Sequence, residues 1–286
     1  MLFRLTTNST RKLFKSLRPQ RMHQLPNNSS SEASRTTWTP ENYLTASKLK
    51  EQLYAVIILN RPIHLDQDFV IEMWNSAQFR HTVDGGTDRW LTFLEGNPEA
   101  NILHPDMITG DFDSVKPDTL SHFESLNCEV IRTQDQNETD FTKALRQLAP
   151  RLSLRGVETV IVLADTSGRL DQIMANINTL FKAQNFAPDL KIFIMSSNSL
   201  SWLLPPGHHT IDIPPNVLEQ KVWCSLIPIG HKCVLSTRGL KWDMTNKTTQ
   251  FGGLVSTSNT YSGSPAVDIT TGDHVLWCMG TRKEKD

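Results

Sequence analysis

The sequence predicts an α/β fold in two parts: a mostly parallel, Rossmann-like α/β domain, followed by a C-terminal antiparallel β-sandwich domain. From about residue 53 to residue 204, short apolar runs alternate with segments whose apolar residues recur at helical spacing. This alternation is typical of a parallel sheet with helices on both faces. From residue 206 onwards the runs are short and strand-like, and Gly, Pro and Asn separate them without a helical period, as in antiparallel sandwiches or barrels. We therefore expect domains at 41–205 and 206–286.

The elements of the first domain are expected where this alternation is clearest. Strands are predicted in the runs YAVIILN (54–60), HTV (81–83), MIT (107–109), CEVIR (128–132), ETVIVL (158–163) and KIFIM (191–195). Helices are predicted in 66–79, after Gly86, in 139–149 and in 168–184. Thr139 is expected to be an N-cap, because its hydroxyl can accept from a free backbone N–H of the first turn.

The second domain is expected to contain strands only. Its strand-like runs are KVWCSLIPI (221–229), KCVLSTRGLKW (232–242), GGLVSTSNTY (252–261), AVDITTG (266–272) and HVLWCMG (274–280).

The overall composition excludes several classes of protein. The chain has 286 residues, of which 38% are hydrophobic and 21% charged, as in ordinary globular proteins. Its formal net charge of −1 argues against a nucleic-acid binder. No apolar run reaches the ~18 residues that span a bilayer, so no membrane association is expected. The four cysteines form no C-x-x-C pair, which favours reduced, mostly buried thiols over a zinc site or a disulfide framework.

The N-terminal segment differs in charge from the rest of the chain. Residues 1–38 contain a single acid, Glu32, and the basic residues Arg4, Arg11, Lys12, Lys15, Arg18, Arg21 and Arg35. Two interpretations stay open: a mitochondrial targeting sequence or a disordered basic extension with no targeting role. In both cases residues 1–40 are expected to lie outside the fold.

The stretch GDFDS offers two carboxylates two residues apart, Asp111 and Asp113, directly after a predicted strand. Oxygen ligands of this kind suit Mg²⁺, but solvated acids in an Asx-turn would fit as well. Asp118, which follows Pro117, is expected to be a helix N-cap without a chemical role.

Other polar motifs also follow predicted strands, where ligands bind in open α/β sheets. DGG (84–86) has the glycines of a tight turn, and TQDQNETDFTK (133–143) contains the acids Asp135 and Asp140. In ADTSGRLDQ (164–172), Gly168 permits close backbone approach and Arg169 can bind a phosphate. Each motif alone also has a purely structural interpretation as a turn or a cap. Neither G-x-x-x-x-G-K-[ST] nor G-x-G-x-x-G occurs among the fourteen glycines, which argues against a P-loop kinase or a dinucleotide dehydrogenase.

Taken in order, these motifs resemble those of the eukaryotic thiamine pyrophosphokinase family. The resemblance covers about residues 53–279 and is carried by DGG (84–86), GDFDS (110–114), DQ-x-x-TDFTK (135–143), GRLDQIMA-x-x-NTLF (168–181), WC-x-LIP-x-G (223–230), GLKW (239–242) and LVSTSNTY (254–261). It implies a Mg²⁺-dependent transfer of diphosphate from ATP to the hydroxyl of thiamine, with AMP as the second product. It also implies a homodimer with its active sites at the subunit interface, in a family that is typically cytoplasmic.

The resemblance further implies roles for individual residues. Mg²⁺ would be held by Asp111, Asp113 and Asp140, and the catalytic set would add Asp84, Arg169 and Asp171. ATP would also be bound by Gly85, Gly86, Asp135, Gly168 and Gln172. Thiamine would be bound by Trp242, Ser256, Ser258 and Asn259. The candidates for the general base are two carboxylates, those of Asp84 and Asp171.

The sequence departs from the family pattern in three places. Ala164–Asp165 stands where a Gly-Gly pair is usual, and Asp88 and Asp243 each stand where Asn is usual. None of these positions belongs to the expected metal ligands. Two other functions are alternatives: a metal-dependent nucleotide phosphohydrolase using the same carboxylates, and a binding protein without catalysis.

Overall fold

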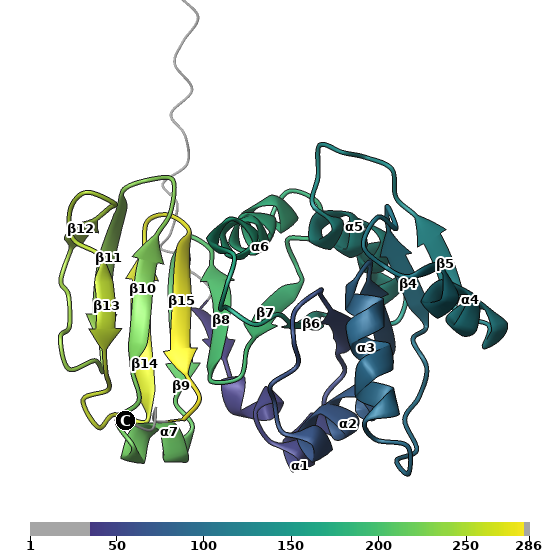
Figure 1. Ribbon diagram of the computed structural model, residues 1–286. Coiled ribbons are helices and arrows are strands. Elements are labelled where there is room, and N and C mark those ends of the chain that lie inside the picture. Colours follow the sequence, from purple (N-terminus) through teal and green to yellow (C-terminus); the bar gives the residue numbers. More distant parts are fainter. Residues whose placement is uncertain (1–34, 283–286) are drawn as a thin grey trace, which may run out of the picture. The chain divides into compact units, whose positions relative to one another are not determined.

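The computed structural model describes residues 35–282 (Figure 1). The two interpretations of the N-terminal segment therefore concern residues outside the described part, apart from 35–40. Residues 35–40 were expected to lie outside the fold, and this was wrong. Arg35–Trp38 forms β1, which pairs in parallel with β9 (Gly207–Asp212). Burial drives this pairing, because Trp38 is only 6% exposed and its ring packs 5.7 Å from that of Trp202.

The larger of the two sheets has ten strands in the order β13-β10-β15-β8-β7-β6-β2-β3-β4-β5. Six of them run parallel: β2 (Ala55–Ile58), β3 (Phe79–Val83), β4 (Met107–Gly110), β5 (Glu129–Arg132), β6 (Thr159–Leu163) and β7 (Lys191–Met195). The other four are antiparallel to their neighbours: β8 (Ser199–Leu204), β10 (Cys224–Pro228), β13 (Ser256–Asn259) and β15 (Val275–Gly280).

Helices cover both faces of the parallel part, as the alternation of elements predicts (Figure 1). Val56 and Ile58 of β2 belong to the core beneath α2 (Gln67–Ser76) and α3 (Gly86–Glu95). Ala55 and Ile57 belong to the opposite core, beneath α5 (Asp140–Ser153) and α6 (Leu170–Ala183). The remaining helices are η1 (Pro40–Tyr43), α1 (Ala46–Leu49), α4 (Pro117–Ser125) and α7 (Pro215–Glu219). The short helix α7 interrupts a region that was expected to contain strands only.

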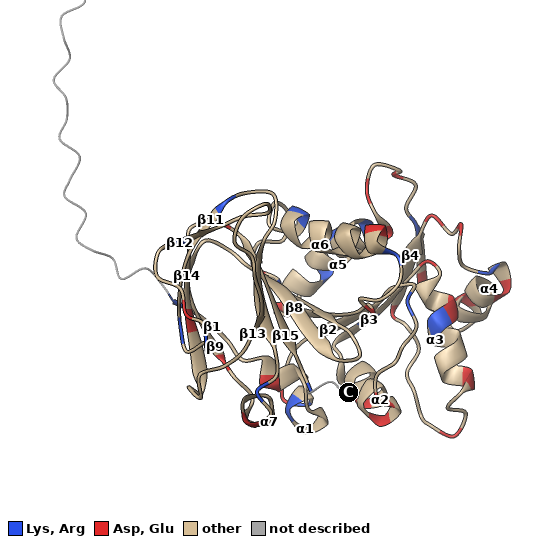
Figure 2. Cartoon of the chain, turned by 60° about the vertical axis from the view of Figure 1, so that its left-hand side comes forward, with Lys and Arg blue, Asp and Glu red and all other residues tan. Residues whose placement is uncertain are grey.

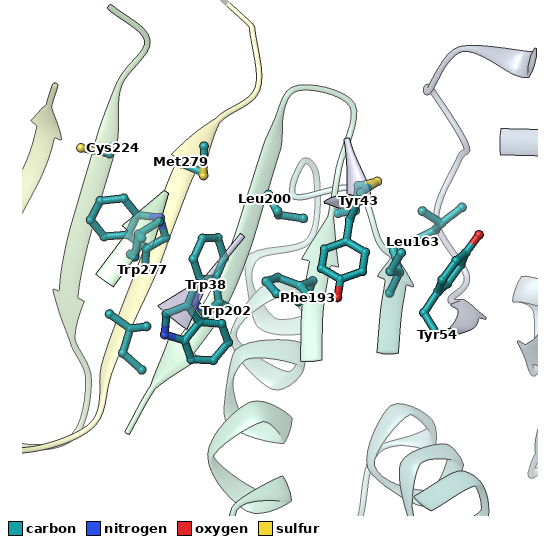
Figure 3. Close-up of a cluster of buried hydrophobic side chains, with 14 of the residues drawn as sticks. Trp38, Tyr43, Tyr54, Leu163, Phe193, Leu200, Trp202, Cys224, Trp277 and Met279 are labelled. Carbon is teal, nitrogen blue, oxygen red and sulfur yellow. The ribbon is translucent and has the colours of Figure 1, made fainter. Parts of the chain in front are cut away.

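The second sheet has the order β1-β9-β14-β11-β12 and is antiparallel apart from β1. Its other strands are β11 (Cys233–Arg238), β12 (Lys247–Thr249) and β14 (Ala266–Thr271). Its inner residues share one apolar core with β8, β10 and β15, and Trp38, Trp202 and Trp277 lie close together within it (Figure 3). The expected β-sandwich is therefore present, and the antiparallel half of the ten-stranded sheet forms its second layer. The division into domains at residue 205 stays a prediction. The larger sheet contains strands from both sides of this position.

Several local features of the fold were also predicted. Thr139 is the N-cap of α5 and accepts from the backbone N–H of Thr142 at 3.2 Å. Asp118 is not an N-cap: α4 has Lys116 at that position and begins at Pro117, as suits a proline without an N–H to donate. All four cysteines are free, and three are buried. No helix among the described residues is long and apolar enough to cross a membrane.

Candidate active site

Three aspartates from separate segments meet at the carboxyl ends of the parallel strands. Asp84 follows β3, Asp111 follows β4, and Asp140 is the first residue of α5. One carboxylate oxygen from each lies within 4.8 Å of the others. Figure 2 shows acidic positions at the end of β3 and beside α5. We call Asp84, Asp111 and Asp140 the carboxylate cluster.

The cluster depends on a close approach of two backbones. A Cβ at Gly110 would lie 2.8 Å from the Cβ of Asp84, which is closer than packed atoms tolerate. Asp84 and Phe112 both adopt left-handed backbone conformations, with φ of 45° and 63°. Such angles are uncommon outside glycine and often occur at functional sites. The glycine of GDFDS is therefore required for the two strand ends to meet.

Asp113 does not join the cluster, although it was expected to be a metal ligand. It is exposed, and its Oδ1 accepts from the hydroxyl of Ser114 at 2.9 Å. Its own N–H donates to Asp111 Oδ1 at 3.3 Å. The structure thus brings Asp84, rather than Asp113, to Asp111 and Asp140.

Burial and a neighbouring lysine both act on the carboxyl of Asp140. Burial raises the pKa of its carboxyl, and the nearby ammonium of Lys143 opposes that rise. Lys143 Nζ lies 2.7 Å from Asp140 Oδ1 and 3.9 Å from Asp111 Oδ2. Lys143 was not among the predicted site residues. The signal for it was its position in TDFTK, one helical turn after Asp140, which puts both on one face of α5.

A cavity of about 400 Å³ opens beside the cluster. Its polar lining residues are Asn60, Arg61, Asp84, Asp113, Ser114, Thr139, Asp140, Arg169, Gln172 and Asn176. These residues come from the ends of β2 and β3, the loop after β4 and the starts of α5 and α6, beside the point where the strand order reverses between β2 and β6. Crevices at such points are the usual ligand sites of open α/β sheets. A larger hollow of about 530 Å³ behind α5 contains none of the predicted site residues.

Arg169 and Asp171 form an exposed ion pair at the start of α6. Their side chains are 67% and 63% exposed, and Arg169 Nε donates to Asp171 Oδ1 at 3.1 Å. This hydrogen bond lowers the pKa of the Asp171 carboxyl. Arg169 lines the cavity, whereas Asp171 does not. An exposed guanidinium at the rim can exchange this carboxylate for a phosphate.

The predicted glycines lie where neighbouring atoms leave no room for a side chain. A Cβ at Gly86 would lie 2.5 Å from the carbonyl oxygen of Ile58, and one at Gly85 would lie 2.3 Å from Asn60 Nδ2. The pair therefore lets the start of α3 pack on the end of β2. Gly168 has φ of 83° and lies against the guanidinium of Arg61.

Asp135, in contrast, folds back within its own loop. Its Oδ1 accepts from the backbone N–H of Asn137 at 2.8 Å. It does not line the cavity.

The residues expected to bind thiamine are gathered elsewhere, around β13. Trp242 is 55% exposed, and Lys241 Nζ lies 4.4 Å from the centre of its ring system. Asn259 is buried and holds the backbone of Trp242, accepting from its N–H at 3.2 Å and donating to its carbonyl at 3.0 Å. Ser256 accepts from Asn259 at 3.4 Å, and Ser258 has φ of 54°. None of these four predicted residues lines the cavity beside the carboxylate cluster.

The three departures from the family pattern have local partners. Asp88 accepts from the hydroxyl of Thr119 at 2.6 Å and so links α3 to α4. Asp243 accepts from the backbone N–H groups of Gly239 and Leu240, both at 3.1 Å.

Asp165 connects two loops beside the cavity. Its carboxylate accepts from the hydroxyl of Ser167 at 2.8 Å and lies 3.2 Å from His64 Nδ1. His64 belongs to the loop after β2, so this contact joins the loops that follow β2 and β6.

Two family models match the chain. One is described as "Thiamin pyrophosphokinase, catalytic domain" and matches residues 70–194. The other is described as "Thiamin pyrophosphokinase, vitamin B1 binding domain" and matches residues 208–276. The chain belongs to the thiamine pyrophosphokinase family.

Individual members of the family agree with this assignment. Thiamine pyrophosphokinase 3 from Oryza sativa subsp. japonica is 31% identical over 245 residues, which cover 80% of this chain and 87% of that protein. Thiamine pyrophosphokinase 1 from Arabidopsis thaliana is 32% identical over 244 residues, with shares of 80% and 87%. The solved structure of thiamin pyrophosphokinase from Candida albicans has a TM-score of 0.75 at 25% identity and covers 90% of this chain and 96% of its own.

Proposed function

We propose that the protein is a thiamine diphosphokinase, which transfers a diphosphate group from ATP to the hydroxyl of thiamine and releases AMP. The observation that carries the proposal is the carboxylate cluster beside a cavity rimmed by Arg169, at the carboxyl ends of the parallel strands. Family membership supports the choice of substrates, since the relatives are named for this activity. A site that brings triphosphate and carboxylates together needs an added positive charge.

The donors of the cluster suit Mg²⁺. They are carboxylate oxygens, which are the hard ligands that Mg²⁺ prefers. Asp140 Oδ1 is buried and lies 2.7 Å from the ammonium of Lys143, so this oxygen already faces a cation. We propose Asp84, Asp111 and Asp140 as the ligands. When bound, the ion would neutralise charge on the phosphate oxygens.

The reaction divides into tasks that named residues can perform. The thiamine oxygen forms a bond to the β-phosphorus, the bond between this phosphorus and the oxygen bridging to the α-phosphate breaks, and AMP leaves with that oxygen. Arg169 would leave Asp171 to bind the transferred phosphates. Asp171, freed in this way, could accept the proton of the hydroxyl. Gln172, at the cavity wall, would help to hold the nucleotide in line for transfer.

We also propose that the active site is completed by a second copy of the chain. Trp242 and β13 do not line the cavity, so one chain does not bring the proposed thiamine residues to the carboxylates. Both regions expose large apolar side chains. These are Leu170 and Met174 on α6, and Trp242, Phe251 and Leu254 around β13. An aromatic face such as that of Trp242 suits the cationic thiazolium ring of thiamine.

The proposed location is the cytoplasm, as the resemblance implies, with mitochondrial import by residues 1–40 as the alternative. Fusing residues 1–40 to a fluorescent protein distinguishes the two locations.

The test of the proposed activity is the identity of the nucleotide product. The purified protein is incubated with ATP, Mg²⁺ and thiamine, and the nucleotides are separated by chromatography. AMP should appear only when thiamine is present, together with an equal amount of thiamine diphosphate. Asp111→Asn serves as the matched inactive variant. ADP as the product, or ATP turnover that does not depend on thiamine, would contradict the proposal.

A further inference from the structure

Lys143 is a buried basic residue that contacts two members of the carboxylate cluster. It is 6% exposed. Its Nζ lies 2.7 Å from Asp140 Oδ1 and 3.9 Å from Asp111 Oδ2, and it donates to the carbonyl of Thr133 at 3.1 Å. Within residues 35–282, it is the only basic side chain within 4.0 Å of a cluster carboxylate.

The charges around Lys143 do not balance. One ammonium contacts two of three carboxylates, and an oxygen of each of the three lies within 4.8 Å of the others. Buried charges of like sign repel strongly when no cation separates them. The ammonium therefore supplies the positive charge on which the cluster depends in the absence of a metal ion.

A metal ion would have to share this position with Lys143. The ion and the ammonium would both be drawn to Asp111 and Asp140, and two cations a few ångströms apart repel each other. A lysine ammonium sits on a flexible stem and can move to another acceptor. The phosphates of a nucleotide are such acceptors, and they would arrive in the adjoining cavity.

We propose that Lys143 holds the place of the metal ion in the nucleotide-free protein, so that the ion binds tightly only together with the nucleotide. Lys143 is then a positioning residue that orders binding: free cation is disfavoured, and the nucleotide draws the ammonium away as the metal enters. This inference rests on the proposed function, which supplies the metal and the nucleotide. It adds a competition between an internal cation and an external one.

The experiment measures two affinities that should change in opposite directions. Free Mn²⁺, which uses the same oxygen ligands as Mg²⁺, is titrated into the full chain and followed by electron paramagnetic resonance. The Mn²⁺ complex of α,β-methylene ATP, which cannot transfer its diphosphate, is titrated by calorimetry. In Lys143→Gln, the affinity for free Mn²⁺ should rise about tenfold, because a competing cation is lost. The affinity for the nucleotide complex should fall about tenfold, because a phosphate contact is lost.

Two variants serve as controls. Lys143→Arg keeps the charge and should keep the weak binding of free Mn²⁺. Lys182→Met removes a lysine of α6 that lies 3.9 Å from Glu138, and both affinities should stay at their original values. Lys143→Met is the second neutral variant, for use if Lys143→Gln does not fold.

Two results would overturn the inference. One is unchanged or weaker binding of free Mn²⁺ in the neutral variants, which would indicate that Lys143 is merely structural. The other is an equal gain in Lys143→Arg, which would point to altered packing rather than to lost charge. Failure of the proposed function would look different, since the original protein would then bind no nucleotide complex while the free Mn²⁺ titration still reported on Lys143.

Discussion

Asp84 reaches the carboxylate cluster because its backbone adopts the left-handed conformation, with φ of 45°. Asp84 is 5% exposed, and its Oδ1 also accepts from the backbone N–H of Ser114 at 3.4 Å. Asp113, two residues beyond Asp111, remains exposed. At the scale of single residues, burial and backbone angle separate the two carboxylates more clearly than their motifs do.

A pair of isosteric variants tests this distinction. Asp84→Asn should lower the rate of AMP formation about 100-fold or more, because a metal ligand is lost. Asn tolerates the left-handed backbone, so the fold should persist. Asp113→Asn should have a much smaller effect. Rates at several Mg²⁺ concentrations provide the measurement, and an equal loss in both variants would show that Asp113 is as important as Asp84.

His81 is expected to make the protein sensitive to acid. It is fully buried in β3, and burial lowers the pKa of its imidazole from 6.5 to about 3. As the pH falls below 6.5 the unfolded chain takes up a proton that the folded chain refuses, so this residue favours unfolding progressively down to about pH 3. The free energy of unfolding should fall by up to about 1.4 kcal/mol per pH unit from this residue.

Urea unfolding between pH 7 and pH 4 measures that dependence. His81→Gln cannot take up the proton, and its amide can still bond with Thr109, whose hydroxyl lies 2.9 Å from the histidine ring. Its stability should therefore depend less steeply on pH than that of the original protein. Parallel curves for the two proteins would contradict the assignment.

At the scale of elements, the site depends on how closely the end of β3 approaches the end of β4. Gly110 closes β4, and a Cβ there would lie 2.8 Å from the Cβ of Asp84. Gly110→Ala should force the two strand ends apart, destabilise the fold by about 1–3 kcal/mol, and reduce metal affinity. Denaturant unfolding and Mn²⁺ titration measure the two effects.

Gly96 offers a matched control for that substitution. It closes α3 with a right-handed backbone, and a Cβ there would meet its nearest atoms at 3.5 Å. Gly96→Ala should leave metal affinity unchanged. If Gly110→Ala behaves like Gly96→Ala, the close approach of β3 and β4 is not required for the site.

Sequence patterns predicted these elements better than they predicted the contacts between them. The parallel strands β2, β6 and β7 were visible as local apolar runs, because burial on both faces leaves a continuous pattern. The cluster was partly predicted: Asp111 and Asp140 were expected as ligands, and Asp84 was expected as a catalytic residue but not as a ligand. The choice between Asp84 and Asp113 depends on the φ of Asp84 and Phe112, which residue types do not reveal.

Other features were missed because their cause lies far along the chain. The strand β1 pairs with β9, which lies more than 170 residues later in the chain. The composition of the sequence around β1 resembles that of a linker. Lys143 was overlooked since a lysine one turn after an acid usually forms an ordinary exposed pair. Its burial becomes apparent only when α5 lies over the ends of β4 and β5.

At the scale of the whole molecule, the proposed dimer can be tested by mixing two inactive variants. Asp111→Asn damages the carboxylate half of a site, and Trp242→Ala damages the thiamine half. If each site combines both halves from different chains, equal mixing after reversible unfolding should restore about one quarter of the original activity, because half the dimers are mixed and each has one intact site. The rate of AMP formation measures this. Activity no higher than that of the separate variants would show that each site is built within one chain.

The ten-stranded sheet also constrains how the enzyme can move. The parallel strands pass directly into the antiparallel ones through the pairing of β7 with β8, where Ile194 faces Ser201 and Met195 faces Leu200. Backbone hydrogen bonds thus form an unbroken ladder from the acidic strand ends to the layer that bears β13. A hinge between the two regions would have to break that ladder. Substrate entry and product release should therefore depend on movements of loops and subunit contacts, while the sheet itself stays rigid.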